Sequence, residues 1–305
     1  MPDTIRLGTF TPSVLLGVAR RTGRLDDAGL EVTETLVQSS PGQFAALLDG
    51  TLDAVLTSPD NVLAYRYSPA NPLGRTADVR ILSAVDRGMG LALYSRASPA
   101  GLRGATFGVD VPASGFAFAM YALAASLGLK REEYEVVALG STPRRLTALL
   151  AGECAATMLN AGNELHAERA GYRALARAGK VCAPYLGTVL ATVRTDDRPR
   201  HGSGGAEAHA ALARVLADTA RAVLSGTLDV EVVEEAGAAL DLPGPLGSRY
   251  LARCKDPDEG LVPDGIVDPD AIRVLVDLRR RYGPPLHDDP YDAALVPGSG
   301  LLASR

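Results

Sequence analysis

An internal repeat is the feature of this sequence that most restricts its fold. Ala46–Asn61 reads ALLDGTLDAVLTSPDN, and Ala148–Asn163, which begins 102 residues later, reads ALLAGECAATMLNAGN. Aligned without gaps, the two segments share an Ala-Leu-Leu start, one glycine, one later alanine and the final asparagine. Each predicts the end of an amphipathic helix, a glycine C-cap, a short apolar strand and a polar turn. A repeat of this length predicts two similar lobes and not a solenoid, which needs shorter and more numerous units.

The residues before each copy also correspond. A strand, a helix start and a second strand precede the first copy, at Ile5–Gly8, Pro12-Ser13 and Leu30–Val37. The same three features precede the second copy, at Ala105–Val109, Pro112 with Ser114, and Tyr134–Leu139. One β-α-β-α-β unit therefore occurs twice, which predicts an α/β protein in which helices flank a mostly parallel sheet in each lobe.

The order of the predicted elements also suggests how the lobes are connected. Val189–Val193 is apolar and β-branched, so we expect a strand there that returns the chain to the first lobe. Residues 1–94 and 190–305 are then predicted to form a discontinuous lobe I, and residues 95–189 an inserted lobe II. Two crossings near 94–97 and 187–190 predict a two-strand hinge.

Composition excludes several classes of function. The net charge is −5 with both signs interspersed, aromatic residues make up 5% and there is no tryptophan, which argues against a nucleic-acid partner. We find no apolar run of about 18 residues, so no transmembrane segment is predicted. The start, MPDTIRLG, has no signal-peptide pattern. We therefore expect a cytoplasmic protein if Met1 is the native start, and a periplasmic or cell-surface protein if a signal was removed.

Several ordered patterns resemble a known family. They are GRLDDAGLEV, ALLDGTLDAVL, LRGATFGVDVPASG, EVVALGSTPRRLTALLAGE and GLVPDGIVDPDAIRVLVDLRRRYG. In this order they are similar to type II solute-binding proteins of ABC transporters, in the sulfonate/nitrate/taurine-binding and thiamine-pyrimidine-synthesis-like branch. The resemblance covers nearly the whole chain. It implies a periplasmic-binding-protein type II clamshell that closes on a small molecule, with an ABC permease as the partner of exported members.

The same resemblance leaves two functions open. One is a binder of a small anionic or polar organic molecule, either the substrate-binding component of an ABC-type uptake system or a cytoplasmic homologue. The other is a cytoplasmic lyase-like or decarboxylase-like enzyme that acts on a small organic acid. The Cys of desulfinase relatives is absent from the loop Thr9–Ser13, and the Cys cluster and His pattern of the pyrimidine synthases is also missing. No catalytic residues carry over from these branches.

Candidate site residues follow from the expected strand ends. Ligands of open α/β sheets bind beyond the carboxyl ends of the strands, where helix N-termini present free N–H groups. The ligand-binding candidates are Phe10, Thr11, Ser13, Ser39, Ser58, Asp60, Asn61, Arg87, Asp110, Ser114, Gly115, Phe116, Asn160 and Asn163. Two facing helix starts, Pro12-Ser13 and Ala113-Ser114-Gly115, are expected to hold an anionic group. Taken singly, Ser13 and Ser114 are better interpreted as N-caps.

The charged candidates also have structural interpretations. Arg87 suits a carboxylate, sulfonate or phosphate, and equally a solvated turn. Asp60, Asp86 and His166 are the candidate acid/base groups, although capping is the favoured role for Asp60 and Asp110. Pairing with Glu164 on a helix surface is the favoured role for His166. The sequence contains no H-E-x-x-H, paired Cys/His spacing or Walker A motif, so neither a metal nor a cofactor is predicted.

Overall fold

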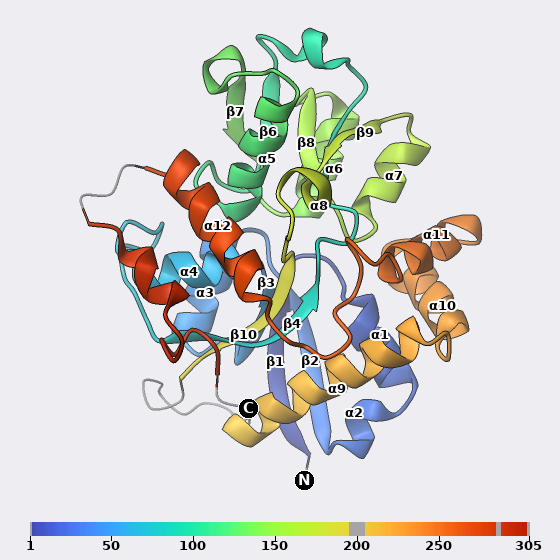
Figure 1. The fold of residues 1–305 in the computed structure, drawn as a ribbon. Coiled ribbons are helices and arrows are strands. Elements are labelled where there is room, and N and C mark those ends of the chain that lie inside the picture. The colour runs from blue at the N-terminus through green and yellow to red at the C-terminus, as the bar shows by residue number, and fades with distance from the viewer. Residues whose placement is uncertain (1, 195–204, 285–287, 304–305) are drawn as a thin grey trace.

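Two mixed sheets organise the fold, and Figure 1 shows them in separate lobes, one above the other. The computed structural model describes residues 2–194, 205–284 and 288–303. The first sheet has the order β2-β1-β3-β10-β4. Its strands are β1 (Asp3–Thr9), β2 (Leu30–Leu36), β3 (Ala54–Thr57), β4 (Val79–Asp86) and β10 (Thr188–Val193). The second sheet has the order β7-β6-β8-β5-β9. Its strands are β5 (Ala92–Ser95), β6 (Thr106–Val109), β7 (Glu135–Ala138), β8 (Ala156–Leu159) and β9 (Arg173–Arg177).

The sequence repeat appears as equivalent strands in the two sheets. The first copy forms β3, which pairs in parallel with β1, with Leu7 opposite Ala54. The second copy forms β8, which pairs in parallel with β6, with Phe107 opposite Ala156. Each sheet then gains an antiparallel strand beside its repeat strand, β10 in the first and β5 in the second. The prediction of two mostly parallel α/β lobes is therefore confirmed.

Helices cover both sheets and connect their strands. Those in the first part of the chain are α1 (Val14–Arg21), α2 (Arg24–Asp27), α3 (Ser40–Leu48), α4 (Pro59–Tyr67), α5 (Gly115–Ser126), α6 (Thr142–Ala151), α7 (Asn163–Arg169) and α8 (Ala178–Val181). Those after β10 are α9 (Ala206–Leu224), α10 (Asp229–Leu240), α11 (Pro245–Cys254) and α12 (Pro269–Tyr282). Short 3-10 turns are η1 (Pro99–Leu102), η2 (Arg131–Glu133) and η4 (Pro290–Leu295).

The chain passes between the sheets at two adjacent segments. It leaves the first sheet after Asp86 and enters the second at Ala92, so the predicted boundary at 94/95 falls inside β5, which pairs wholly within the second sheet. It returns between the end of α8 and the start of β10. The outgoing segment contains three consecutive residues with positive φ, Gly88, Met89 and Gly90. Both crossings therefore lie a few residues before the positions that the sequence predicted for the hinge.

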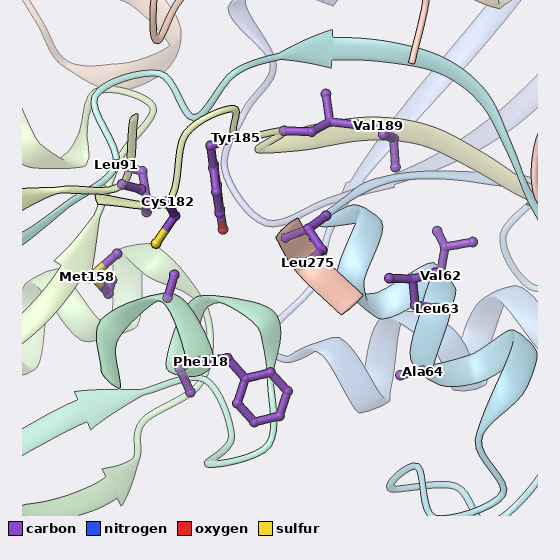
Figure 2. Close-up of a cluster of buried hydrophobic side chains, with 14 of the residues drawn as sticks. Val62, Leu63, Ala64, Leu91, Phe118, Met158, Cys182, Tyr185, Val189 and Leu275 are labelled. Carbon is purple, nitrogen blue, oxygen red and sulfur yellow. The ribbon is translucent and has the colours of Figure 1, made fainter. Parts of the chain in front are cut away.

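A continuous apolar core reaches from one sheet to the other. Leu63 of α4, Phe118 of α5 and Leu275 of α12 are buried in it, and Figure 2 shows the three side chains as members of one cluster. On the second sheet Met158 joins the same cluster. Helix α12 contacts both α4, which follows β3 of the first sheet, and α5, which follows β6 of the second. The C-terminal part of the chain therefore packs against both lobes.

Two further features concern membranes and thiols. Across the described residues, no helix is both long enough and apolar enough to cross a membrane. Cys154, Cys182 and Cys254 are buried free thiols. Burial raises the pKa of Cys154 and of Cys182 to about 11, which makes both thiols unreactive near neutral pH.

Candidate ligand-binding site

A pocket lies between the two sheets, at the carboxyl ends of β1, β3, β4, β6 and β8. Its cavity volume is about 130 Å³. Strand-end residues from both sheets line it, among them Thr57 of the first and Asn160 of the second. Carboxyl ends of parallel strands meet at one edge of each sheet, so the two edges face each other across this space.

Most of the candidates from the sequence line this pocket. They are Phe10, Thr11, Ser13, Ser58, Asn61, Asp110, Ser114, Gly115, Phe116 and Asn160. Asp86, predicted as an acid/base candidate, also lines it. Phe10 and Phe116 are only partly buried, and both form part of the pocket wall.

The N-cap interpretation of the two serines is confirmed. Ser13 Oγ accepts a hydrogen bond from the Leu16 N–H at the start of α1, and Ser114 Oγ accepts one from the Ala117 N–H at the start of α5. At α1 a carboxylate of this chain already occupies part of the expected anion position. Glu34 Oε1 accepts hydrogen bonds from the Ser13 N–H and from the Thr9 hydroxyl, both at 2.8 Å. An anionic ligand at this helix start would therefore meet a negative charge.

Arg87 does not line the pocket, although its hydrogen-bond partner Leu261 does. Its Nη1 donates to Leu261 O at 2.9 Å, so the guanidinium is directed toward the C-terminal segment. Ser39 also lies outside the lining and caps α3, accepting from the Gly42 N–H at 3.2 Å. Neither placement supports the ligand contacts expected from the sequence.

Asp60 is part of a buried ion pair and not a helix cap. Ser58 caps α4 in its place, accepting a hydrogen bond from the Asp60 N–H. The two Asp60 carboxylate oxygens accept from Arg279 Nε at 2.6 Å and Nη2 at 2.9 Å. Burial raises the pKa of Asp60, and the Arg279 guanidinium opposes that rise. A carboxylate held in this way is not free to act on a ligand.

The last two candidates lie behind the pocket. Asn163 Nδ2 donates to Thr11 Oγ1 at 3.2 Å, so this side chain positions a lining residue across the gap between the sheets. His166 Nε2 lies 2.8 Å from Leu240 O, and this side chain does not line the pocket. The expected surface pair of His166 with Glu164 is wrong, because Glu164 is fully buried.

Several lining residues were not predicted. They are Met89, Ser141, Thr142, Arg145, Thr188, Tyr250 and other apolar neighbours. Arg145 carries the one positive charge among the described residues of the lining, and its side chain is buried. Its Nη1 donates to Gly140 O at 2.6 Å and its Nη2 to Thr142 Oγ1 at 2.9 Å, while Nε and Nη2 also reach Met158 O. Burial lowers the pKa of Arg145 to about 10, so the group remains charged near neutral pH.

Asp86 is a lining residue whose acidity is perturbed by burial. Burial raises its pKa to about 6, against the hydrogen bonds that it accepts from Thr188 and from the Gly88 N–H. Tyr250 reaches the pocket from α11, and its burial raises its pKa well above the ordinary value. Within the described residues, no group of three or more His, Cys, Asp or Glu side chains is arranged to hold a metal ion.

Comparison with known proteins identifies the fold. No protein-family model and no curated protein sequence matches this chain. Among solved structures, the alkanesulfonate-binding protein SsuA from Xanthomonas axonopodis pv. citri is similar, with a TM-score of 0.73 at 16% identity over 95% of this chain and 97% of that one. The periplasmic nitrate-binding protein NrtA from Synechocystis PCC 6803 has a TM-score of 0.75 at 11% identity over 96% and 85%.

A third similar structure is the Candida albicans CA3427 product, described as exhibiting the generic periplasmic binding protein fold. Its TM-score is 0.68 at 13% identity, over 95% of this chain and 92% of that one. All three matches extend over nearly the full length of the chain. The chain therefore has the two-lobed fold of type II solute-binding proteins of ABC transporters.

Proposed function

We propose that this chain binds a small molecule by closing its two lobes around the pocket, and that it serves an ABC-type uptake system. The observation that carries the proposal is the construction of the pocket, which takes lining residues from the strand ends of both sheets. A cavity of about 130 Å³ is smaller than the roughly 300–1,000 Å³ of pockets for drug-sized ligands. The ligand is accordingly a small metabolite.

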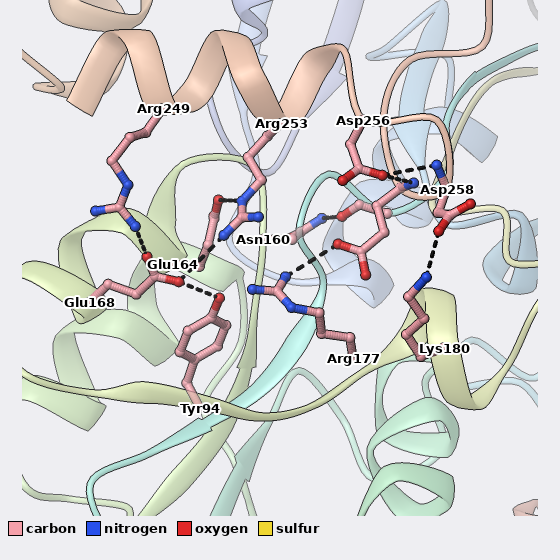
Figure 3. A network of polar contacts seen from close by, with 12 residues as sticks. Tyr94, Asn160, Glu164, Glu168, Arg177, Lys180, Arg249, Arg253, Asp256 and Asp258 are labelled. Carbon is pink, nitrogen blue, oxygen red and sulfur yellow. Dashed lines mark hydrogen bonds and ion pairs between the residues drawn. The ribbon is translucent and has the colours of Figure 1, made fainter. Parts of the chain in front are cut away.

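Contacts across the gap support closure as the mode of binding. On one side, Ser141 N donates to Gln38 O at 2.9 Å, and Ser40 N donates to Asp110 Oδ2 at 3.1 Å. On the other, Figure 3 shows α11 and the following loop paired with side chains of the second sheet and of α7. A neutral hydrogen bond contributes about 0.5–1.5 kcal/mol net and a charged one about 1.5–3 kcal/mol, so this small number of contacts leaves opening of the lobes energetically accessible.

We place the hinge at the two crossing segments, where Gly187 packs directly on Gly88. A Cβ on Gly187 would lie 2.5 Å from Gly88 Cα, and backbone cannot move aside as a flexible side chain can. Gly187→Ala is expected to lower the free energy of unfolding by roughly 1–3 kcal/mol, as overpacking does, measured by urea unfolding. Gly101→Ala is the control, because its Cβ would make only ordinary contacts, the nearest at 3.6 Å. Equal stabilities for the two variants would contradict the close packing of the two crossing segments.

The test of the function is a thermal-shift screen against small organic acids, sulfonates, amines and heterocycles, followed by mass spectrometry of each hit. A ligand present at about 100 times its Kd stabilises the native state by about 2.7 kcal/mol, which raises Tm by several degrees. Phe116→Ala removes an apolar wall and is expected to reduce the shift, whereas Arg87→Ala should leave it unchanged. If no compound raises Tm, the binding function is refuted.

An enzyme remains the second candidate because of one residue. Asp86 lines the pocket, and its pKa of about 6 suits a general acid or base near neutral pH. The mass-spectrometric step separates the two functions. A ligand recovered unchanged supports the binder, and a ligand consumed by the wild type and not by Asp86→Asn supports the enzyme.

A further inference from the structure

The carboxylate of Asp110 has one engaged oxygen and one free oxygen. Asp110 follows β6 and lines the pocket, although only 8% of the residue is exposed. Its Oδ2 accepts the Ser40 N–H of α3 at 3.1 Å, which joins the two sides of the pocket. Its Oδ1 is buried and has no hydrogen-bond partner among the described residues. A buried acceptor without a partner is costly, so a donor that reaches it gains binding free energy.

The other charges of the pocket are already engaged by the protein. Asp86 Oδ1 accepts the Gly88 N–H at 2.7 Å. Arg145 directs its guanidinium toward the Gly140 and Met158 carbonyls and the Thr142 hydroxyl. The described lining thus contains one cation, Arg145, whose donors are used within the chain, and two carboxylates, Asp86 and Asp110, of which Asp110 keeps one oxygen without a partner. A ligand with an anionic head group would meet these carboxylates and the Glu34 carboxylate that bonds the Ser13 N–H.

We propose that the pocket selects a small ligand with an amine N–H donor, which bonds Asp110 Oδ1 while its apolar part lies against Phe10 and Phe116. This inference rests on the proposed binding function and specifies its ligand class. A charge-assisted hydrogen bond from an ammonium or ring amino group to a carboxylate is among the strong ones in proteins. The rings of Phe10, Phe116 and Tyr250 in the lining suit a ligand with a ring or a short apolar chain.

Three probes that share one ring test the ligand class: cyclopentylamine, cyclopentanol and cyclopentanecarboxylate, titrated against the full chain by calorimetry. We expect cyclopentylamine to bind most tightly and cyclopentanecarboxylate not to bind. Asp110→Asn is expected to weaken the binding of cyclopentylamine by about tenfold to a hundredfold, because the substitution removes the negative charge. The Asn side chain retains an acceptor for the Ser40 N–H. The affinity for cyclopentanol, which is neutral, should change much less.

Glu153→Gln is the matched control, since it removes one negative charge from an exposed position beyond α6 and should leave all three affinities unchanged. The preference of the wild type among the probes needs no variant, so it stands as a test even if Asp110→Asn does not fold. Tight binding of the carboxylate in place of the amine would overturn the ligand class and leave the binding function intact. Amine binding that is equal in the wild type and Asp110→Asn would overturn the role of Asp110. No binding of any probe, together with an empty thermal-shift screen, would overturn both proposals.

Discussion

Asp60→Asn is expected to lower the free energy of unfolding by about 3–5 kcal/mol, because it leaves Arg279 buried without its partner. The guanidinium makes two hydrogen bonds to Asp60 and a third, at 2.8 Å, to the Tyr291 hydroxyl. It also lies 5.2 Å from the Phe118 ring centroid. Arginine keeps its proton at any pH that proteins tolerate, so the uncompensated charge cannot be neutralised. Urea unfolding measures the change.

The control for this prediction lies on α12, the helix that carries Arg279. Asp270→Asn breaks an ion pair with Arg273 whose side chains are 67% and 56% exposed, so little change in stability is expected. Arg279→Met should cost less than Asp60→Asn, since burial raises the pKa of Asp60 and the carboxyl can take up a proton. Equal losses in Asp60→Asn and Asp270→Asn would show that the buried pair does not hold α12 against α4.

The sequence predicts the sheets well because the repeat contains the local signals that form them. Each copy has a helix, a glycine with positive φ and a four-residue apolar strand, and the structure places these at equivalent positions in both sheets. The strand ends then predict the pocket, since loops after parallel strands gather at one edge. This rule depends only on chain order, and that is why it places Phe10, Asp110 and Asn160 together.

Partners that are distant in the sequence are not predictable in this way. The bond from Arg279 to Asp60 joins residues 219 positions apart, and no local pattern indicates it. Arg145 is different, because a signal for it exists. Thr142, Arg145 and Ala148 are spaced as one buried helix face, whereas the adjacent Arg144 is exposed. That spacing identifies the arginine that faces the pocket.

Arg87 is the reverse case, a residue that the sequence predicted as a ligand contact and that does not line the pocket. Its position after a strand end suggested a ligand contact, yet an arginine side chain is long enough to turn toward another segment, here the carbonyl of Leu261. Position in the chain therefore predicts where a backbone lies better than where a long side chain points. Asp86 and Asp110, which have short side chains at similar strand ends, do line the pocket.

The stability of the protein is expected to fall as pH rises from about 4.5 to about 7, and Glu164→Gln is expected to remove much of that fall. Glu164 is fully buried, and burial raises its pKa to about 7. The folded state therefore holds a proton that the unfolded state has released over this range. The rise in pKa from the ordinary value of 4.5 to about 7 lowers the free energy of unfolding by about 3 kcal/mol at the alkaline end.

The surroundings of Glu164 make glutamine a close substitute (Figure 3). Glu164 Oε2 accepts the Gly162 N–H at 2.8 Å, and a glutamine oxygen can do the same. The charged neighbours are Glu168, Arg249, Arg253 and, further along, Arg177 with Glu259. Arg253 lies 3.8 Å from Glu164 and 3.5 Å from Glu168, so it keeps a carboxylate partner in the variant.

Urea unfolding of the wild type and Glu164→Gln between about pH 4 and about pH 8 measures the difference in slope. At the acidic end the two proteins should be nearly equal in stability, because a protonated glutamic acid resembles glutamine. At the alkaline end the variant should be more stable by up to about 3 kcal/mol. A smaller fall of the same sign should persist in the variant, since burial also raises the pKa of Asp86, to about 6. Parallel curves for the two proteins would mean that Glu164 stays ionised in the folded state, with Arg253 offsetting the cost of its burial.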